Sequence, residues 1–196
     1  SQKIQVIIVL ILAYNFPPFI RASSLITHSW FVEFTEEIEV TVITRKWAGD
    51  VIYNRENYFQ EDKGDVEIST ISPTRCIYQI PNKHNNYFKL KSNKIAIRLK
   101  LNKLLTLIEQ FLKWTKLYYF DNERQLYYAA REILNKNQFD FILTSGEPFV
   151  LFKYASNLKK EFNTSIALDY RDGWSTNSQR NSSKNIFQKI ILWNEK

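Results

Sequence analysis

The stretch "FDFILTSGEPFVLFKYASNLKKEFNTSIALDY", residues 139–170, contains two short apolar runs separated by a helical pattern. The runs at 139–145 and 164–170 predict strands. Pro148 near the start of the middle segment predicts a helix over Pro148–Phe162, because proline is tolerated in a first helical turn. A strand, a crossover helix and a second strand form a unit whose strands run parallel. This stretch therefore predicts an α/β fold.

The same alternation extends to both sides of this stretch. The apolar run Lys3–Ala13 predicts a strand covered on both faces. A helix from about Ser23 to Phe34 should follow, with Ser23 or Ser24 as N-cap and Leu25, Trp30 and Phe34 facing inward. Further strands are predicted at 38–44, 66–71 and 76–80, a long loop at 45–66, and helices at about 89–119, 121–135 and 183–194. The whole chain, residues 1–196, is predicted to be one Rossmann-like domain, a parallel sheet flanked by helices.

Composition limits the class of protein. The chain has 196 residues, of which 44% are hydrophobic, enough for a real core. Its single cysteine, Cys76, forms no internal disulfide, which favours a reducing compartment and a cytoplasmic location. The run at 6–13 is shorter than the ~18–20 apolar residues of a membrane span and lacks a signal-peptide cleavage site. The net charge of +7 allows nucleic acid, an anionic membrane or a phosphorylated ligand.

Three unusual loops follow the carboxyl ends of predicted strands, where open parallel sheets bind their ligands. They contain "YNFPPFIRASS" at 14–24, Gly146-Glu147-Pro148, and Arg171-Asp172-Gly173-Trp174. We expect them to converge on one cleft. The backbone N–H groups at 22–24, with Arg21 beside them, could receive an anion at a helix N-terminus. The alternative is that the prolines only stiffen the loop and Arg21 is solvated.

Several common sites are not indicated by the sequence. The first loop lacks the glycines of a dinucleotide fingerprint and the glycines and lysine of a phosphate-binding loop. No nucleophile elbow and no metal-ligand spacing occurs, and His28 and His84 are interpreted as ordinary residues. We therefore expect no metal, no cofactor and no nucleic-acid partner.

Three stretches together resemble one family: "LAYNFPPFIRASSLITHSW", "FTEEIEVTVITRKWAGD" and "FDFILTSGEPFVLFKYASNLKKEFNTSIALDYRDGWSTN". They are similar to the N-terminal domain of GT-B glycosyltransferases of the retaining, family-4-like (group 1) branch. The family pattern is Y-x-F-P-P after a strand, then E-V-T-V-I-T, F-D-x-I-x-x-S-x-x-P and D-x-R-D-x-W, and all four pieces occur here in order. The chain departs from it at Phe19-Ile20-Arg21-Ala22, where glycines are usual, and at Gly173, where proline is usual.

The resemblance implies an enzyme with two Rossmann-like domains that transfers a sugar from a nucleotide-sugar donor to a glycan or lipid-linked acceptor. Such reactions build cell-surface polysaccharide or glycolipid. This chain would be the acceptor-side half, inactive alone, and the donor-binding C-terminal domain would lie outside it. The alternative is a non-catalytic α/β module that binds a nucleotide or phosphosugar.

Under this resemblance, Glu147 and Asp172 are the candidate catalytic residues and would orient acceptor hydroxyls. Asp169 and Arg171 share a strand face and are interpreted mainly as a salt bridge that braces the site, while Trp174 would either pack against sugar or close the loop. The candidate substrate-binding residues are Pro18, Arg21, Ser23, Ser24, Ser145, Gly146, Arg171 and Trp174.

The segment 89–116 is strongly basic, with eight Lys or Arg residues against one acidic residue, Glu109. Its helical pattern has an apolar stripe that would suit the protein core or a membrane surface. Core packing explains the stripe but not the cations, so we expect peripheral contact with an anionic membrane on its inner face, the alternative being a solvated cationic face. The candidate membrane-facing residues are Lys100, Lys103, Lys113 and Lys116.

Overall fold

The structure is a computed structural model that describes residues 6–47, 61–62, 64–83, 104–105, 108, 123–146 and 148–170. The chain divides into two compact units. The first comprises residues 1–83 and 125–169, and it contains the sheet described below. The helices predicted at 89–119 and 183–194 fall outside the described residues, apart from three positions in the first of them.

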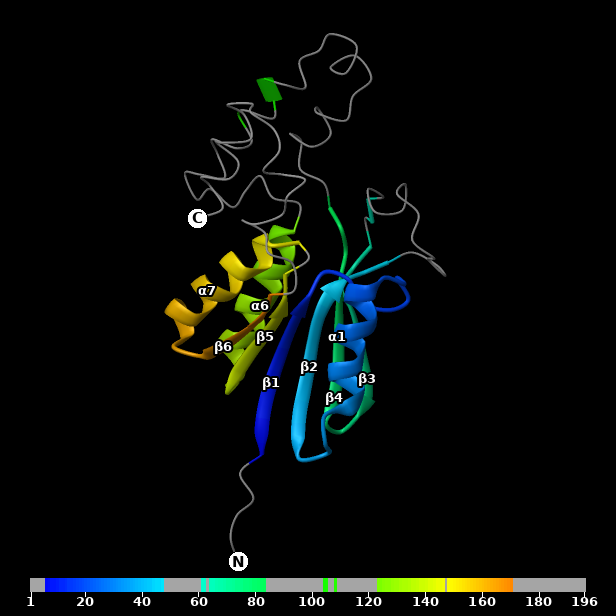
Figure 1. The fold of residues 1–196 in the computed structure, drawn as a ribbon, viewed down its shortest axis with the longest axis vertical. Helices are drawn as coiled ribbons and strands as arrows, with labels where there is room; N and C mark the ends of the chain where they lie inside the picture. Colours follow the sequence, from blue (N-terminus) through cyan, green and yellow to red (C-terminus); the bar gives the residue numbers. More distant parts are fainter. Residues whose placement is uncertain are drawn as a thin grey trace, which may run out of the picture. The chain divides into compact units, whose positions relative to one another are not determined.

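The fold is α/β, with a six-stranded, mostly parallel sheet (Figure 1). The strands are β1 (Ile7–Ala13), β2 (Ile38–Arg45), β3 (Glu67–Ser72), β4 (Arg75–Ile80), β5 (Phe141–Ser145) and β6 (Ser165–Asp169). The helices in the described residues are α1 (Ala22–Glu33), α6 (Arg124–Lys136) and α7 (Val150–Phe162). The order of strands in the sheet is β3-β4-β2-β1-β5-β6.

The sheet differs from the predicted one at its β3 edge. A parallel sheet was expected, but β3 runs antiparallel to β4 and forms a hairpin with it. The reason lies in the connection, since only Pro73 and Thr74 join the two strands. A parallel pair would need a crossover of a dozen or more residues.

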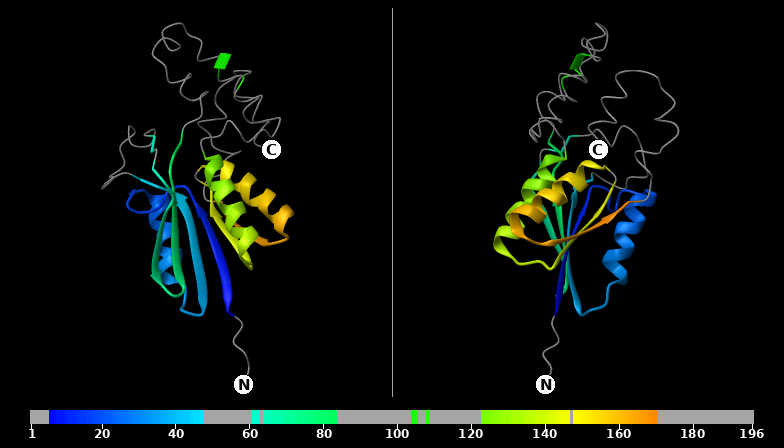
Figure 2. Two further views of the ribbon diagram at one scale, coloured as in Figure 1. Left: turned by 180° about the vertical axis from the view of Figure 1, so that it is seen from behind. Right: turned by 60° about the vertical axis from the view of Figure 1, so that its left-hand side comes forward.

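The helices cover opposite faces of the sheet (Figure 2). The path from β1 through α1 to β2 moves toward one edge, whereas the path from β5 through α7 to β6 moves toward the other. Because such crossovers are right-handed, the two helices pack on different faces, α1 on one and α7, with α6, on the other. The direction of winding therefore reverses between β1 and β5.

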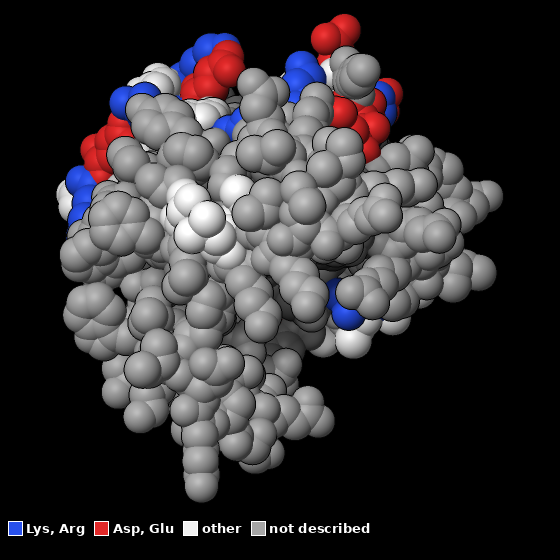
Figure 3. Space-filling model, turned by 90° about the horizontal axis from the view of Figure 1, so that it is seen from above, with Lys and Arg blue, Asp and Glu red and all other residues white. Residues whose placement is uncertain are grey.

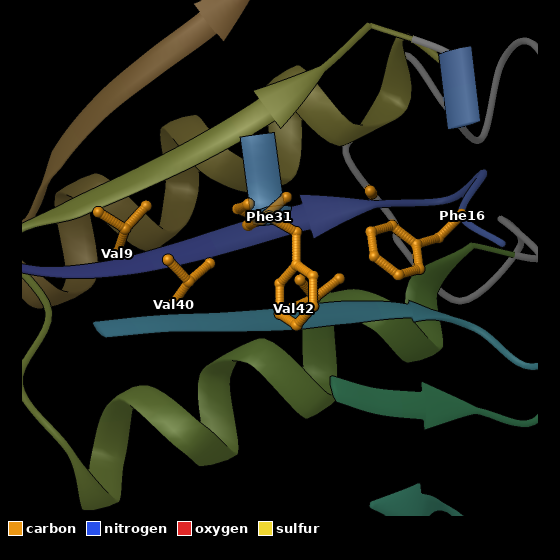
Figure 4. Packing of buried hydrophobic residues seen from close by; sticks show 7 residues of the cluster. Val9, Phe16, Phe31, Val40 and Val42 are labelled. Atoms are coloured by element: carbon orange, nitrogen blue, oxygen red, sulfur yellow. The ribbon is translucent and has the colours of Figure 1, made fainter. Parts of the chain in front are cut away.

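An apolar cluster joins α1 to the sheet (Figure 4). Val9 on β1 and Val40 and Val42 on β2 lie under Phe31 of α1, and Phe16, in the loop after β1, belongs to the same cluster. Full burial of a side chain of this size contributes about 1.5–3 kcal/mol to folding. This cluster fixes α1 over the centre of the sheet.

The inner face of α1 is unusually polar. Ser23, Ser24 and Thr27 are buried, whereas Leu25 is 54% exposed, so the prediction that Leu25 faces inward was wrong. The small hydroxyl residues are accommodated because they hydrogen-bond to the preceding loop, as Thr27 Oγ1 does to the Asn15 carbonyl at 2.9 Å. Trp30 and Phe34 are partly buried against the apolar cluster, as expected.

The N-cap of α1 also differs from the prediction. Arg21, in an extended conformation at φ −148° and ψ 164°, is the N-cap instead of Ser23 or Ser24. Ser24 occupies the third helical position, where its Oγ accepts the Arg21 N–H and donates to the Arg21 carbonyl, both at 2.8 Å. The N-cap therefore lies two or three residues earlier than the serines suggested.

The opposite end of α1 is held by Arg75, the first residue of β4. The guanidinium is buried and donates hydrogen bonds to the carbonyls of Phe31 (2.9 Å), Ile38 (2.6 Å), Thr35 (3.2 Å) and Phe34. It therefore supplies donors to the carbonyls that a helix end leaves without partners and places a cation at the negative end of the helix dipole. Arg75 thus ties the last turn of α1 to β2 and β4.

Among the described helices, none is long and apolar enough to cross a membrane.

Candidate functional site

The reversal of winding places the carboxyl ends of β1 and β5 next to each other at the centre of the sheet. Leu12 pairs with Thr144 in the parallel register, and Thr144 Oγ1 donates to the Leu12 carbonyl at 2.7 Å. In open α/β sheets this position is where ligands bind, in the crevice outside the strand ends. Two of the three predicted site loops begin here, after Ala13 and after Ser145.

The loop after β1 is anchored to the first turn of α1. Asn15 Nδ2 donates to Ser23 Oγ at 3.1 Å, and both residues are buried. The next part of the loop contains a cis peptide bond between Pro17 and Pro18, and Pro18 is exposed. The Asn15 side chain and the Asn15 carbonyl, which accepts from Thr27, therefore tie the start of this loop to α1.

The N-terminus of α1 lies at the end of this loop. The first intrahelical bond runs from the Leu25 N–H to the Arg21 carbonyl at 3.0 Å, so the N–H groups of residues 22–24 have no acceptor within the helix. The hydroxyls of Ser23 and Ser24 are buried and hydrogen-bonded inside the protein. Any contact of these two residues with a ligand would therefore be made by their backbone N–H groups.

The loop after β5 is shaped by aromatic packing. Ser145 is buried, and the Gly146 N–H donates to the Asp169 carbonyl at 3.3 Å. A Cβ at Gly146 would lie 2.6 Å from Phe152 Cζ and 2.9 Å from Phe149 Cε1. A side chain at this position would therefore press on the two rings at the start of α7. Glu147, the candidate catalytic residue beside it, lies outside the described residues.

The third predicted loop follows β6, whose last residue, Asp169, pairs in register with Ser145. This places the end of β6 next to the end of β5 at the same edge. Arg171, Asp172 and Trp174 lie outside the described residues, so their roles and the pairing of Arg171 with Asp169 stay predictions. The same holds for Lys100, Lys103, Lys113 and Lys116.

A cation–aromatic cluster at the end of β2 was not predicted as part of the site. Arg45 is 3% exposed, and its Nη1 donates to the Tyr14 hydroxyl at 2.7 Å. The guanidinium lies 4.1 Å from the centroid of the Trp47 ring, which in turn stacks on Phe19 at 3.9 Å. The strand pattern at 38–44 contained the available signal, because it places residue 45 at the carboxyl end of a strand.

The described charges at this edge are mixed. Lys46 lies 2.6 Å from Glu67 and 3.7 Å from Asp62, and the hydrogen bond to Glu67 raises the pKa of the Lys46 ammonium. In the view from above (Figure 3), acidic and basic side chains of the described residues are interspersed along one margin of the molecule. Among the described residues, no group of three or more His, Cys, Asp or Glu side chains could hold a metal ion.

Neither a protein-family model nor a curated protein sequence matches this chain.

Proposed function

We propose that this chain is the acceptor-side, N-terminal domain of a GT-B glycosyltransferase of the retaining, family-4-like branch. The proposed enzyme transfers a sugar from a nucleotide-sugar to a glycan or lipid-linked acceptor, for cell-surface polysaccharide or glycolipid. In this proposal the sheet is the Rossmann-like half of the GT-B fold. The observation that carries the proposal is the coincidence of motif and topology. The Y-x-F-P-P piece follows β1, and the S-x-x-P piece begins at Ser145, the last residue of β5. These are the two strands between which the winding reverses.

The proposed reaction breaks the bond between the sugar C1 and the diphosphate oxygen and forms a bond from C1 to an acceptor oxygen on the same face. The proton of the acceptor hydroxyl goes to the leaving phosphate oxygen, so no separate base is needed. Positive charge develops on the sugar and negative charge on the diphosphate, which favours donors fixed in advance. The N–H groups at 22–24 and Arg21 are the candidates for that task as accessories, and Glu147 and Asp172 would orient the acceptor.

The experiment uses the natural protein that carries this chain and measures nucleoside diphosphate release. The protein is incubated with UDP-glucose, UDP-N-acetylglucosamine, ADP-glucose or GDP-mannose, with and without glycan and lipid-linked acceptors. We expect acceptor-dependent release with one donor. Binding of a nucleotide or phosphosugar without release would support the alternative, a non-catalytic module. If the protein neither binds any of these donors nor releases diphosphate from them, the transferase proposal and the binding-module alternative are both contradicted.

An Ala22→Pro variant tests the helix N-terminus in the same assay. Proline at the first helical position removes one N–H but keeps the fold, because Arg21 already has the extended conformation that a following proline requires. Loss of a hydrogen bond to a charged group should slow release about tenfold or more. Leu25→Ala, on the exposed side of the same helix, is the matched control and should leave the rate unchanged. Equal rates for Ala22→Pro and the control would exclude the Ala22 N–H from the reaction.

We also propose that the basic segment 89–116 contacts an anionic membrane on the cytoplasmic side. Cations near such a surface each contribute about 1 kcal/mol, and salt weakens the attraction. We expect the protein to co-sediment with anionic but not neutral vesicles at low salt. Replacement of Lys100, Lys103, Lys113 and Lys116 by glutamine should abolish this. Unchanged sedimentation of the quadruple variant would contradict the proposal.

A further inference from the structure

Arg45 is a buried cation that the proposed chemistry does not use. Burying a guanidinium costs desolvation free energy, which must be offset by directional contacts of the buried group. In the described residues these contacts are the 2.7 Å hydrogen bond to the Tyr14 hydroxyl and the approaches to the rings of Tyr14, at 5.4 Å, and Trp47, at 4.1 Å.

Each of these contacts is made with Tyr14, in the loop that joins β1 to α1, or with Trp47, which packs on that loop. Tyr14 is the first residue of that loop, and Thr44 Oγ1, from the same end of β2, also donates to the Tyr14 carbonyl at 3.4 Å. Trp47 stacks on Phe19 with the rings 11° from parallel, and Phe19 lies two residues before the N-cap Arg21. The end of β2 therefore holds the loop near both of its ends.

We infer that Arg45 is the positioning residue of the site at the strand ends, holding residues 14–21, and with them the N-terminus of α1, in the conformation that binds ligand. A planar guanidinium suits this task because its donors and its stacking surface fix the Tyr14 hydroxyl and the Trp47 ring at once. An apolar side chain of similar volume would fill the space without fixing either. The nucleotide-sugar as ligand rests on the proposed function, whereas the control of the loop by Arg45 does not.

The first experiment is hydrogen exchange measured by mass spectrometry on the full chain. Arg45→Lys keeps the charge but loses the planar fork. We expect peptides covering residues 14–24 to exchange about tenfold faster or more, as a lost charged hydrogen bond implies, while the α7 peptide over 150–162 is unchanged. Lys136→Arg, at an exposed cation on α6 that pairs with Glu132 of the same helix, is the matched control and should change neither peptide. Unchanged exchange at 14–24, or an equal rise in both peptides, would overturn the inference.

A second variant covers the case in which Arg45→Lys does not fold. Tyr14→Phe removes only the hydroxyl oxygen that accepts from Arg45 and should accelerate the same peptide selectively; if it does not, the inference is wrong. In the diphosphate-release assay, both variants should raise KM several-fold more than kcat falls, which a loss of stability alone would not produce. If the native protein releases no diphosphate, the proposed function fails, and the exchange result still decides the role of Arg45.

Discussion

Replacing Arg75 by methionine removes the guanidinium that holds the last turn of α1. The side chain keeps a similar length and volume, so little cavity is created, and the loss is mainly that of the hydrogen bonds to Phe31, Phe34, Thr35 and Ile38. The perturbation therefore isolates the polar contribution of Arg75 to the position of α1.

The magnitude follows from how far water can reach these carbonyls. Phe31 is buried, so its carbonyl would bear a desolvation penalty of about 1–3 kcal/mol, whereas Phe34, Thr35 and Ile38 are partly or fully exposed and should lose about 0.5–1.5 kcal/mol each or less. Loss of the cation from the helix C-terminus adds about 0.3–1 kcal/mol. Together, these contributions lead us to expect Arg75→Met to lower the free energy of unfolding by about 3–5 kcal/mol.

Urea unfolding followed by far-UV circular dichroism measures this change. Arg75→Lys keeps a cation but offers fewer and differently placed donors, so it should lose an intermediate amount. Arg131→Met is the matched control, because Arg131 pairs with Glu161 at 2.6 Å at a half-exposed site where an ion pair contributes about 0–1 kcal/mol. If Arg75→Met lost no more than this control, the role assigned to Arg75 would be refuted.

Two further predictions concern Gly146 and Tyr78. Gly146→Ala should lower the free energy of unfolding by about 1–3 kcal/mol, and with it the melting temperature, because the new methyl would press on the Phe152 ring. An unchanged melting temperature would show that the ring moves aside freely. Burial, and to a smaller extent interaction with Cys76, raises the pKa of the Tyr78 hydroxyl above its ordinary value of 10.0. The unfolded chain therefore loses this proton first, and the stability that Tyr78 contributes is full below pH 10.0 and lost as pH rises through its folded pKa. Tyr78→Phe should reduce the fall in urea midpoint above pH 10.0, and an equal fall in both proteins would contradict the assigned shift.

The strands and helices of the sheet could be predicted closely because hydrophobic periodicity reports burial directly. Residues 7–13, 38–45 and 141–145 are strands where apolar runs indicated them. Helix α7 begins two residues after Pro148, the predicted start of the helix. The antiparallel β3 was missed because periodicity gives no strand direction, although the gap between the two predicted strands, residues 72–75, is already too short for a parallel crossover. Leu25 was misplaced because hydrogen bonding at Thr27 and Ser24 outweighs hydrophobicity on the inner face of α1.

The site was predictable only where topology determines it. The rule that ligands bind at the carboxyl ends of strands led to the loops after β1 and β5, and these loops do begin side by side. Arg75 could not be found in this way, because it lies at the start of β4 and its partner Phe31 is 44 residues away in sequence. The rule does lead to Arg45 at the end of β2, but not to its partner Tyr14, which is 31 residues away. A buried arginine in a strand has no sequence signature of its own.

The position of β1 in the sheet also has a consequence for the order of folding. Strands β1 to β4 come from one continuous segment, residues 7–80, and β5 and β6 come from another, 141–169. Among the described strands, these two segments pair with each other through β1 and β5, whose partners Leu10 and Ile142 are far apart in the chain. Contacts of such long sequence separation form late, so we expect two half-sheets to form first and then join along this seam. The strand ends that carry the candidate site would then be assembled in the last step of folding.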